Sequence, residues 1–508
     1  MKKAIIWGDH PMVSDLLRQY AERGFQTERT RHGEDGETDY GSSDEVFLLT
    51  GDSPSQKMEE DGKAVETLAG IARSYFPERH GGRRLRCHLL LQSDVSLHLL
   101  QRHDLSDEVR AKLEVCPFTL DEAWGRSIVL DYEPITVRSQ KTVHLVVFGM
   151  TGMGETVAVN AALTAHYPNY TRDTSLRTRV TLIDEDAINK SIRFRQRYRQ
   201  LFDNSYYRVI DARGRRQVTE FHCPECISQG IEGFTDVEWE FVQGTVYDPL
   251  VRDKLRLWAG KRSSQLLTIV FALGDEDNID GAAHLPGKVY ETGTPVYVRL
   301  RHRGLLDMMG PSAIPDGARV FGMADSGYDT RAPLTEMAKT VNYLYDACYH
   351  DNIAGWTGKV VNAAEIDWVK RERLWLGVSA DKRTSNICHA MTVATKMRSV
   401  GLGEEDWDEF HSLTQPDIET LAEVEHNRWC VEELILGWRP CTREEQRSVE
   451  EDITMKETLK RQKTHYDLRP YHDLRPDATG KPSTIYDLCL TACLPLIARS
   501  HTTEGGMP

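Results

Sequence analysis

The 508-residue sequence contains no long apolar run. The longest such stretch covers residues 266–273, whereas a helix needs about 20 apolar residues to cross a bilayer. A basic and apolar leader is also lacking, because the first lysines pass directly into a short strand-like segment, residues 3–8. We therefore expect a cytoplasmic chain that does not insert into a membrane and that reaches one only through a partner.

Paired cysteine motifs and a positive charge balance are absent too. The 10 cysteines include a single Cys-x-x-Cys, at 223–226, whereas a four-ligand zinc site needs a second pair. Scattered thiols indicate a reducing compartment and predict no metal site, although a site at this pair with His222 is the alternative. The net charge of -15 argues against broad nucleic-acid binding. Four arginines at positions 193, 195, 197 and 199 form either a solvated helix face or a contact for an anion.

Catalytic signatures are likewise missing. The sequence contains no Gly-Lys-Ser/Thr phosphate loop, no His-Glu-x-x-His and no nucleophile elbow. An oxidoreductase would need an acid or base beside the nicotinamide, and His166, His284 and His302 each fit a loop or surface position. We therefore predict no catalytic residues and treat an NAD-dependent oxidoreductase as the alternative.

The most informative segment is 144–156, an apolar strand that runs into three glycines. Gly149 permits a tight turn, Gly152 lets the backbone approach a phosphate, and Gly154 allows a helix to pack closely on the strand. The helix predicted from residue 157 offers N–H groups and a partial positive charge to phosphates. This order predicts a nucleotide-binding unit, with a Rossmann-like fold that binds nothing as the alternative.

A second strand, 179–183, ends at Asp184, whose carboxylate can accept hydrogen bonds from ribose hydroxyls and so favours NAD or an adenine nucleotide over a 2′-phosphorylated cofactor. Further strands are predicted at 241–248, 266–273 and 295–299, and ligands lie at the carboxyl ends of parallel strands. The predicted cofactor-binding residues are Gly149, Met150, Thr151, Gly152, Met153, Gly154, Asp184, Glu185, Gly244, Thr245, Gly274 and Asp275.

The first part of the chain repeats this pattern in a weaker form. A strand at 3–8 leads into a loop with one glycine, and further strands are predicted at 45–50 and 87–91. Asp9 in that loop would repel a pyrophosphate. We expect a Rossmann-like module without a dinucleotide, used for packing or pairing.

Residues 140–330 resemble the regulator-of-potassium-conductance domain, also called the Trk-type NAD-binding domain. The resemblance rests on the glycine-rich loop, Leu182-Ile183-Asp184, Gln243-Gly244-Thr245 and the acidic loop 274–278. This chain lacks the aspartate that the family carries between Gly244 and Thr245. The resemblance implies ligand sensing and a homodimer or higher homo-oligomer in the bacterial cytoplasm, with a membrane transporter as partner in trans and without bond chemistry.

Residues 416–500 resemble the ryanodine-receptor (RyR) repeat domain. They contain one helix–Gly-Trp–loop unit, with helix 418–429 and loop 465–474, and no pore segment. Aromatic rings and an arginine can stack a base and hold a phosphate, and the resemblance implies a nucleotide-derived ligand in a defence response. The predicted ligand residues are Glu425, Asn427, Arg428, Trp429, Trp438, Tyr466 and Tyr471. The alternative is that these rings form a small core and that the charged residues orient the helix.

The sequence thus predicts an α/β chain with tandem Rossmann-like parallel-sheet domains, a helical bridge and a small helical domain. The expected divisions are 1–139, 140–330, 331–412, 413–500 and a disordered tail at 501–508. The expected function is a cytosolic ligand sensor that binds NAD(H) or an adenine nucleotide, and a second ligand or partner through the RyR-type domain. Ion transport or a nucleotide-signalled defence response would be its target. An oxidoreductase or a scaffold that binds no ligand are the alternatives.

Overall fold

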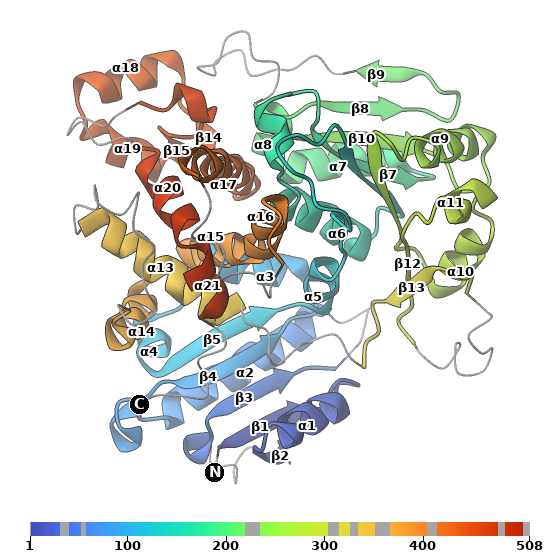
Figure 1. The fold of residues 1–508 in the computed structure, drawn as a ribbon. Coiled ribbons are helices and arrows are strands. Elements are labelled where there is room, and N and C mark those ends of the chain that lie inside the picture. Colours follow the sequence, from blue (N-terminus) through green and yellow to red (C-terminus); the bar gives the residue numbers. More distant parts are fainter. Residues whose placement is uncertain are drawn as a thin grey trace.

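The computed structural model consists of two parallel β-sheets and a layer of helices packed between and beside them (Figure 1). It describes residues 2–30, 40–51, 57–218, 234–302, 314–325, 334–350, 366–403, 414–475 and 483–500. The Cys-x-x-Cys motif at 223–226, with His222, and the predicted tail at 501–508 lie outside the described residues. The two parallel-sheet domains and the accompanying helices confirm the predicted α/β class with tandem parallel sheets, whereas the RyR-type character of the last segment stays a prediction.

The first sheet is fully parallel, with the strand order β2-β1-β3-β4-β5. This is the 2-1-3-4-5 order of flavodoxin-like sheets, in which the strand order reverses between β1 and β3. Its strands are β1 (Lys3–Gly8), β2 (Gln26–Thr30), β3 (Glu45–Leu49), β4 (Leu85–Leu90) and β5 (Leu113–Phe118). Its helices are α1 (Val13–Glu22), α2 (Lys57–Ser74), α3 (Asp94–Arg102) and α4 (Asp107–Lys112), and α5 (Leu120–Arg126) leads toward the second domain.

The second sheet has the order β13-β12-β11-β6-β7-β10-β8-β9. Without the β8–β9 hairpin, which is antiparallel, this is the 3-2-1-4-5-6 order of dinucleotide-binding folds, with its reversal between β6 and β11. The strands are β6 (Thr142–Phe148), β7 (Thr178–Asp184), β8 (Tyr207–Ile210), β9 (Arg216–Val218), β10 (Val237–Gln243), β11 (Gln265–Phe271), β12 (Val296–Arg299) and β13 (Ala318–Phe321). The helices are α6 (Gly152–Thr164), α7 (Ala187–Arg197), α8 (Arg199–Asp203), α9 (Pro249–Ala259), α10 (Asp275–Ala283) and α11 (Gly287–Glu291).

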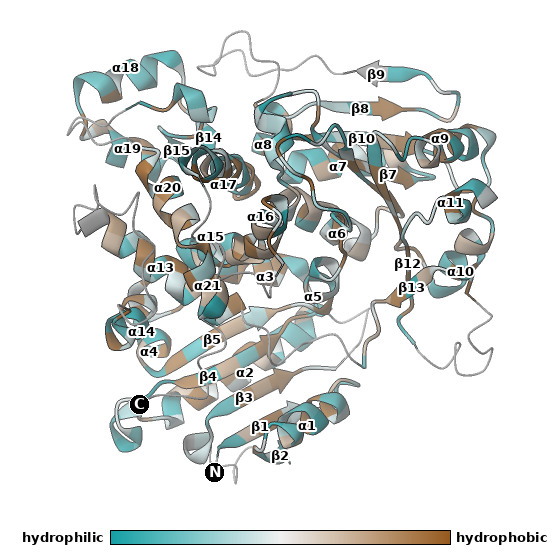
Figure 2. Cartoon of the chain, in the orientation of Figure 1, coloured by the Kyte–Doolittle hydropathy of each residue, from teal (hydrophilic) through white to brown (hydrophobic). Residues whose placement is uncertain are grey.

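Both faces of this second sheet are buried. Along β6, Leu145 and Val147 pack into one apolar core, whereas Val146 and Phe148 pack into another on the opposite face. Alternate side chains of a strand point to opposite faces, so a strand covered on both sides reads as an uninterrupted apolar run. Figure 2 shows apolar residues gathered on the strands of both sheets.

The remaining helices belong to the predicted bridge and to the C-terminal segment. They are α13 (Leu334–His350), α14 (Trp368–Gly377), α15 (Ala380–Met391), α16 (Val393–Ser399), α17 (Gln415–Ile435), α18 (Arg443–Glu451), α19 (Met455–Arg461), α20 (Ile485–Ala492) and α21 (Leu494–Arg499), with the short strands β14 (Arg439–Pro440) and β15 (Thr464–His465). Val341, Met397, Leu421 and Leu494 share one apolar core, which joins the predicted bridge to the C-terminal segment. Among the described helices, none is both long and apolar enough to span a membrane.

At two positions of the loop after β6, neighbouring atoms lie so close to the backbone that only glycine fits. Gly149 has a φ of +99°, and a Cβ there would lie 2.7 Å from Leu273 Cδ2. A Cβ on Gly154 would lie 1.9 Å from the carbonyl oxygen of Gly149. Helix α6 begins at Gly152, earlier than the predicted residue 157, because Thr151 caps it. The third glycine therefore lets α6 pack directly against the turn that precedes it.

Substitution of Gly154 by alanine should destabilise the second domain far more than the same change at Gly152. At Gly154 the added methyl group overlaps a backbone oxygen, and we expect a loss of about 3 kcal/mol, the upper part of the range for over-packing. At Gly152 the nearest heavy atom would be 3.5 Å away, an ordinary contact. Urea unfolding of the two variants tests this expectation, and equal losses would contradict it.

Candidate functional site

The glycine-rich loop lies at the reversal of strand order in the second sheet. Thr151 fixes it from both sides: its Oγ1 donates to the carbonyl oxygen of Ala272, 2.6 Å away, and accepts from the N–H of Gly154 at 3.2 Å. Ala272 directly follows β11, which pairs with β6 along its whole length. The first turn of α6 is thereby held at the carboxyl edge of β6 and β11, where parallel sheets bind their ligands.

Asp184 lies beside this loop and is only 5% exposed. Its Oδ2 accepts from the N–H of Met150 at 2.8 Å and pairs with Lys190 Nζ at 2.7 Å. Its Oδ1 accepts from the N–H of Asp186 at 2.9 Å. A carboxylate has about four lone-pair positions, so these three contacts leave room for one further donor. Asp184 therefore braces the loop and retains the capacity to accept one hydroxyl group.

The other predicted cofactor residues lie along the same edge, because Gln243 pairs with Asp184 in the sheet register. Gly244 has a φ of +149° and donates its N–H to the carbonyl oxygen of Asp184 at 3.0 Å. The N–H of Thr245 donates to Asp248 Oδ2 at 2.6 Å. Glu185 is exposed. Gly244 thus adjoins the glycine-rich loop, whereas the side chain of Thr245 is used within its own turn.

Gly274 and Asp275 follow β11 at that edge but serve α10 and the next strand. Gly274 is the N-cap of α10, and Asp275 Oδ1 accepts from the N–H of Arg301 at 3.0 Å. The carboxylate of Asp275 is therefore turned toward the end of β12. Its predicted role with a cofactor stays a prediction.

Two carboxylates of the first domain face the glycine-rich loop, and the sequence did not indicate them. A Cβ on Gly152 would lie 3.5 Å from Asp121 Oδ2 and 3.8 Å from Asp94 Oδ2. These side chains stand before the first turn of α6, where dinucleotide-binding folds hold the pyrophosphate. Burial and the nearby Asp121 raise the pKa of Asp94 to about 6. Across the described ranges, no group of three or more His, Cys, Asp or Glu side chains could hold a metal ion.

Two of the arginines predicted as a basic cluster, Arg195 and Arg197, contact other side chains of the domain. Arg197 NH1 pairs with Glu155 Oε2 in the first turn of α6 at 2.9 Å. Arg195 NH1 donates to the hydroxyl of Tyr207 at 2.7 Å and stacks on the same ring. These contacts fix α7 against its neighbours.

In the C-terminal segment, Glu425 and Arg428 form the centre of a buried ion network. Arg428 is 1% exposed, and its Nε donates to both oxygens of Glu425 at 3.0 Å. Glu425 also pairs with Lys396 and with His389, and Arg428 pairs with Glu432. Burial acts to raise the pKa of Glu425, but Arg428, His389 and Lys396 hold it well below its usual range. This network fastens α17 to α15 and α16.

The aromatic residues predicted beside these charges divide into two groups. The rings of Trp429 and Trp438 lie 4.9 and 5.8 Å from that of His465, measured between centroids. Tyr471 joins this group through His426, at 5.7 Å. Tyr466 lies instead in a separate apolar cluster, with Arg469 over its ring. Their role in ligand binding stays a prediction.

Asn427 is the remaining predicted ligand residue of this segment. It is buried, and its Nδ2 has no hydrogen-bond partner among the described residues. Its role in ligand binding likewise stays a prediction.

Substitution of Glu425 by glutamine should remove the charge that balances Lys396 and Arg428. We expect a loss of about 3–5 kcal/mol in the free energy of unfolding, because two cations would lose a buried partner. The matched change Glu419→Gln, on an exposed face of the same helix, should alter stability by less than about 0.5 kcal/mol. Chemical unfolding monitored by tryptophan fluorescence distinguishes the two, and a tolerated Glu425→Gln would show that the network is not required.

Comparison with known proteins gives no significant match: no family model, no curated protein and no solved structure matches this chain. The resemblances to the regulator-of-potassium-conductance and RyR domains therefore rest on the sequence motifs alone.

Proposed function

We propose that this protein is a ligand-sensing regulatory protein that binds NAD(H) or an adenine nucleotide at the glycine-rich loop of its second domain. The observation that supports this most directly is the 3-2-1-4-5-6 strand order, with the loop at the reversal between β6 and β11. Open parallel sheets bind ligands at this position because the loops on either side diverge and leave a crevice.

In this proposal the phosphates of the ligand lie against the N-terminus of α6 and its ribose against Asp184. The partial positive charge of the helix end attracts the phosphates. The one lone-pair position that Asp184 retains can accept a ribose hydroxyl, whereas a 2′-phosphate there would be repelled by the carboxylate. The same contacts make a 2′-phosphorylated cofactor the poorer ligand.

Regulation rather than catalysis is favoured by the two carboxylates of the first domain. Asp94 and Asp121 stand beside Gly152, so a bound phosphate and these side chains would repel each other. Ligand binding is thereby coupled to the position of α3 and α5 on α6. Coupling of this kind, in which two groups compete for one element, is the physical basis of an allosteric response.

The wider role follows from the sequence resemblances. A second, nucleotide-derived ligand or a partner would bind the RyR-type segment, and a homo-oligomer would act on a membrane transporter in trans or in a nucleotide-signalled defence response. The alternative activity is an NAD-dependent oxidoreductase. Oxidation of NADH in the presence of carbonyl substrates would establish the oxidoreductase in place of the sensor.

A nucleotide bound at the loop should stabilise the protein against heat. At about 100 times its dissociation constant, the ligand should add about 2.7 kcal/mol to the stability of the domain that binds it. Gly152→Asp should abolish the rise in melting temperature with NAD, NADH, ATP or AMP, because it adds a carboxylate at the phosphate position. Gly62→Asp, on a helix of the first domain with open space around it, is the matched control. A response that is equal in both variants, or absent from the wild type, would favour the scaffold.

Removal of the two first-domain carboxylates should strengthen nucleotide binding. We expect Asp94→Asn and Asp121→Asn each to lower the Kd for NAD by about tenfold, which corresponds to ~1.4 kcal/mol. Because the pKa of Asp94 is raised to about 6, its charge is lost as the pH falls below that value. Wild-type affinity should therefore increase between pH 7.5 and pH 5.5, and Asp94→Asn should flatten this dependence. Asp107→Asn, on an exposed position of the same domain, serves as the control in calorimetric titrations.

A further inference from the structure

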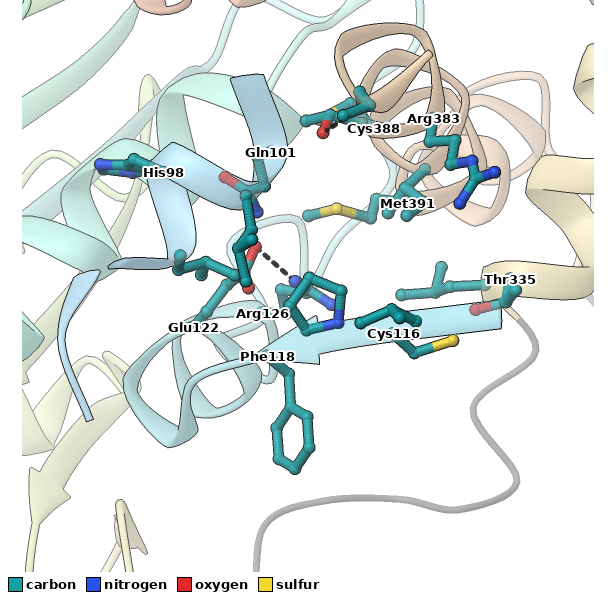
Figure 3. Close-up of a pocket in the computed structure, with 18 of the residues that line it drawn as sticks. His98, Gln101, Cys116, Phe118, Glu122, Arg126, Thr335, Arg383, Cys388 and Met391 are labelled. Atoms are coloured by element: carbon teal, nitrogen blue, oxygen red, sulfur yellow. Dashed lines mark hydrogen bonds and ion pairs between the residues drawn. The ribbon is translucent and has the colours of Figure 1, made fainter. Parts of the chain in front are cut away.

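A cavity of about 300 Å³ lies where the four predicted parts of the chain meet. Helix α3 and strand β5 of the first domain form one side, and α6 of the second domain forms another. Helices α15 and α17 close it, so that the labelled side chains of Gln101, Glu122, Arg383 and Met391 surround one space in Figure 3. Its volume is at the lower end of the range for pockets that hold small molecules.

One complete face of α15 is turned toward this cavity. Its lining residues are Ala380, Arg383, Thr384, Ile387, Cys388 and Met391. They recur every three or four positions, which is the spacing of one helix face. On α6, Val159 and Leu163 line the cavity from the other side. Apolar side chains of both helices therefore contribute to the walls, where they can pack against a flat ring system.

Polar groups with unused hydrogen-bonding capacity line the same cavity. Glu432 is 1% exposed; its Oε2 accepts from Ser385 Oγ at 3.3 Å and pairs with Arg428, but its Oε1 has no partner among the described residues. Glu122 uses one oxygen to pair with Arg126, and its Oε2 is likewise without a partner in the described part of the chain. Buried acceptors without donors are rare in folded proteins because leaving them unpaired is costly. These two oxygens require N–H or O–H donors.

Helix α15 contributes a hydrogen-bond donor, the guanidinium group of Arg383. Arg383 NH2 donates to the carbonyl oxygen of Trp375 at 3.3 Å, and its guanidinium lies 5.4 Å from the centre of the Trp375 ring. Its Nε has no acceptor among the described residues. These three groups, two acceptors and one donor, lie on side chains that other contacts also hold.

Charged side chains of both signs line the cavity. Glu122 and Glu432 would repel a phosphate, and Arg126 and Arg383 would repel a compact cation. Burial raises the pKa of Glu432, and Arg428 opposes this effect, so a neutral donor beside its free oxygen would stabilise the charged form. Charges of both signs, apolar side chains from two helices and polar atoms with unused hydrogen-bonding capacity together favour a neutral, flat ligand with N–H groups.

We propose that this cavity binds a neutral nitrogen heterocycle of nucleoside size, whose amino or ring N–H groups donate to Glu122 and Glu432 and whose ring acceptor receives the Arg383 N–H. The cavity reaches Asp94 and Glu155, which adjoin the glycine-rich loop, but none of residues 149–154 lines it. The inference does not depend on the proposed function of that loop. Because the walls of the cavity come from both sheet domains, α15 and α17, an occupant would hold these four parts in one arrangement.

The test is titration of the full-length protein with adenosine, guanosine and adenine, followed by calorimetry and thermal unfolding. We expect at least one of these probes to bind once per chain and to raise the melting temperature. Met391→Trp should fill the cavity and weaken binding more than tenfold, and Glu122→Gln should do the same by removing an acceptor charge. Met58→Trp, the same substitution at an exposed position on α2, should leave binding unchanged.

Gly152→Asp distinguishes the two sites, because no residue of the loop 149–154 lines the cavity. This substitution should leave binding of the probes intact. Failure of all three probes to bind the wild type would overturn the proposal. Binding that survives both cavity variants but is lost in Gly152→Asp would also overturn it, while supporting a nucleoside site at the loop. If Met391→Trp does not fold, the half-buried position of Glu122 still allows Glu122→Gln to decide the question.

Discussion

The close approach of Gly154 to the carbonyl oxygen of Gly149 is the constraint on which the rest of the structure depends. It brings α6 directly against β6 at the reversal of strand order, and Thr151 then ties the loop to the end of β11. The outer surface of α6 contacts α5 of the first domain and α17 of the C-terminal segment. The position of one helix therefore determines how both neighbouring parts are placed.

Two groups of charged side chains lie near α6: the carboxylates at its N-terminus and the buried ion network of α17. Asp94 and Asp121 place negative charge at the helix N-terminus, which the partial positive charge there stabilises. On the other side, Glu425 and Arg428 form a buried network whose desolvation cost offsets much of its attraction, so its main effect is to fix geometry. Glu432 belongs to this network and also lines the central cavity, so the C-terminal helix is linked to that cavity through one side chain.

The local features of the second domain were predictable from the sequence. The apolar run of β6, the three glycines and the acidic end of β7 are all encoded within a few residues of each other, because strand burial and tight turns depend on local spacing. The start of α6 was predicted too late, since Thr151 acts as a cap only once its hydroxyl group reaches Gly154. Asp94 and Asp121 were missed because ordinary acidic residues in first helical turns carry no signal of what another domain places before them.

The sequence by itself determined the α/β class, the glycine-rich loop and the candidate ribose-binding carboxylate Asp184. Only the tertiary structure decided the different strand orders of the two sheets, the burial of Glu425 and Arg428 as a network, and the cavity shared by four segments. The reason is physical: short-range patterns fix which residues form a strand, turn or helix. Contacts between residues hundreds of positions apart depend instead on how those elements pack.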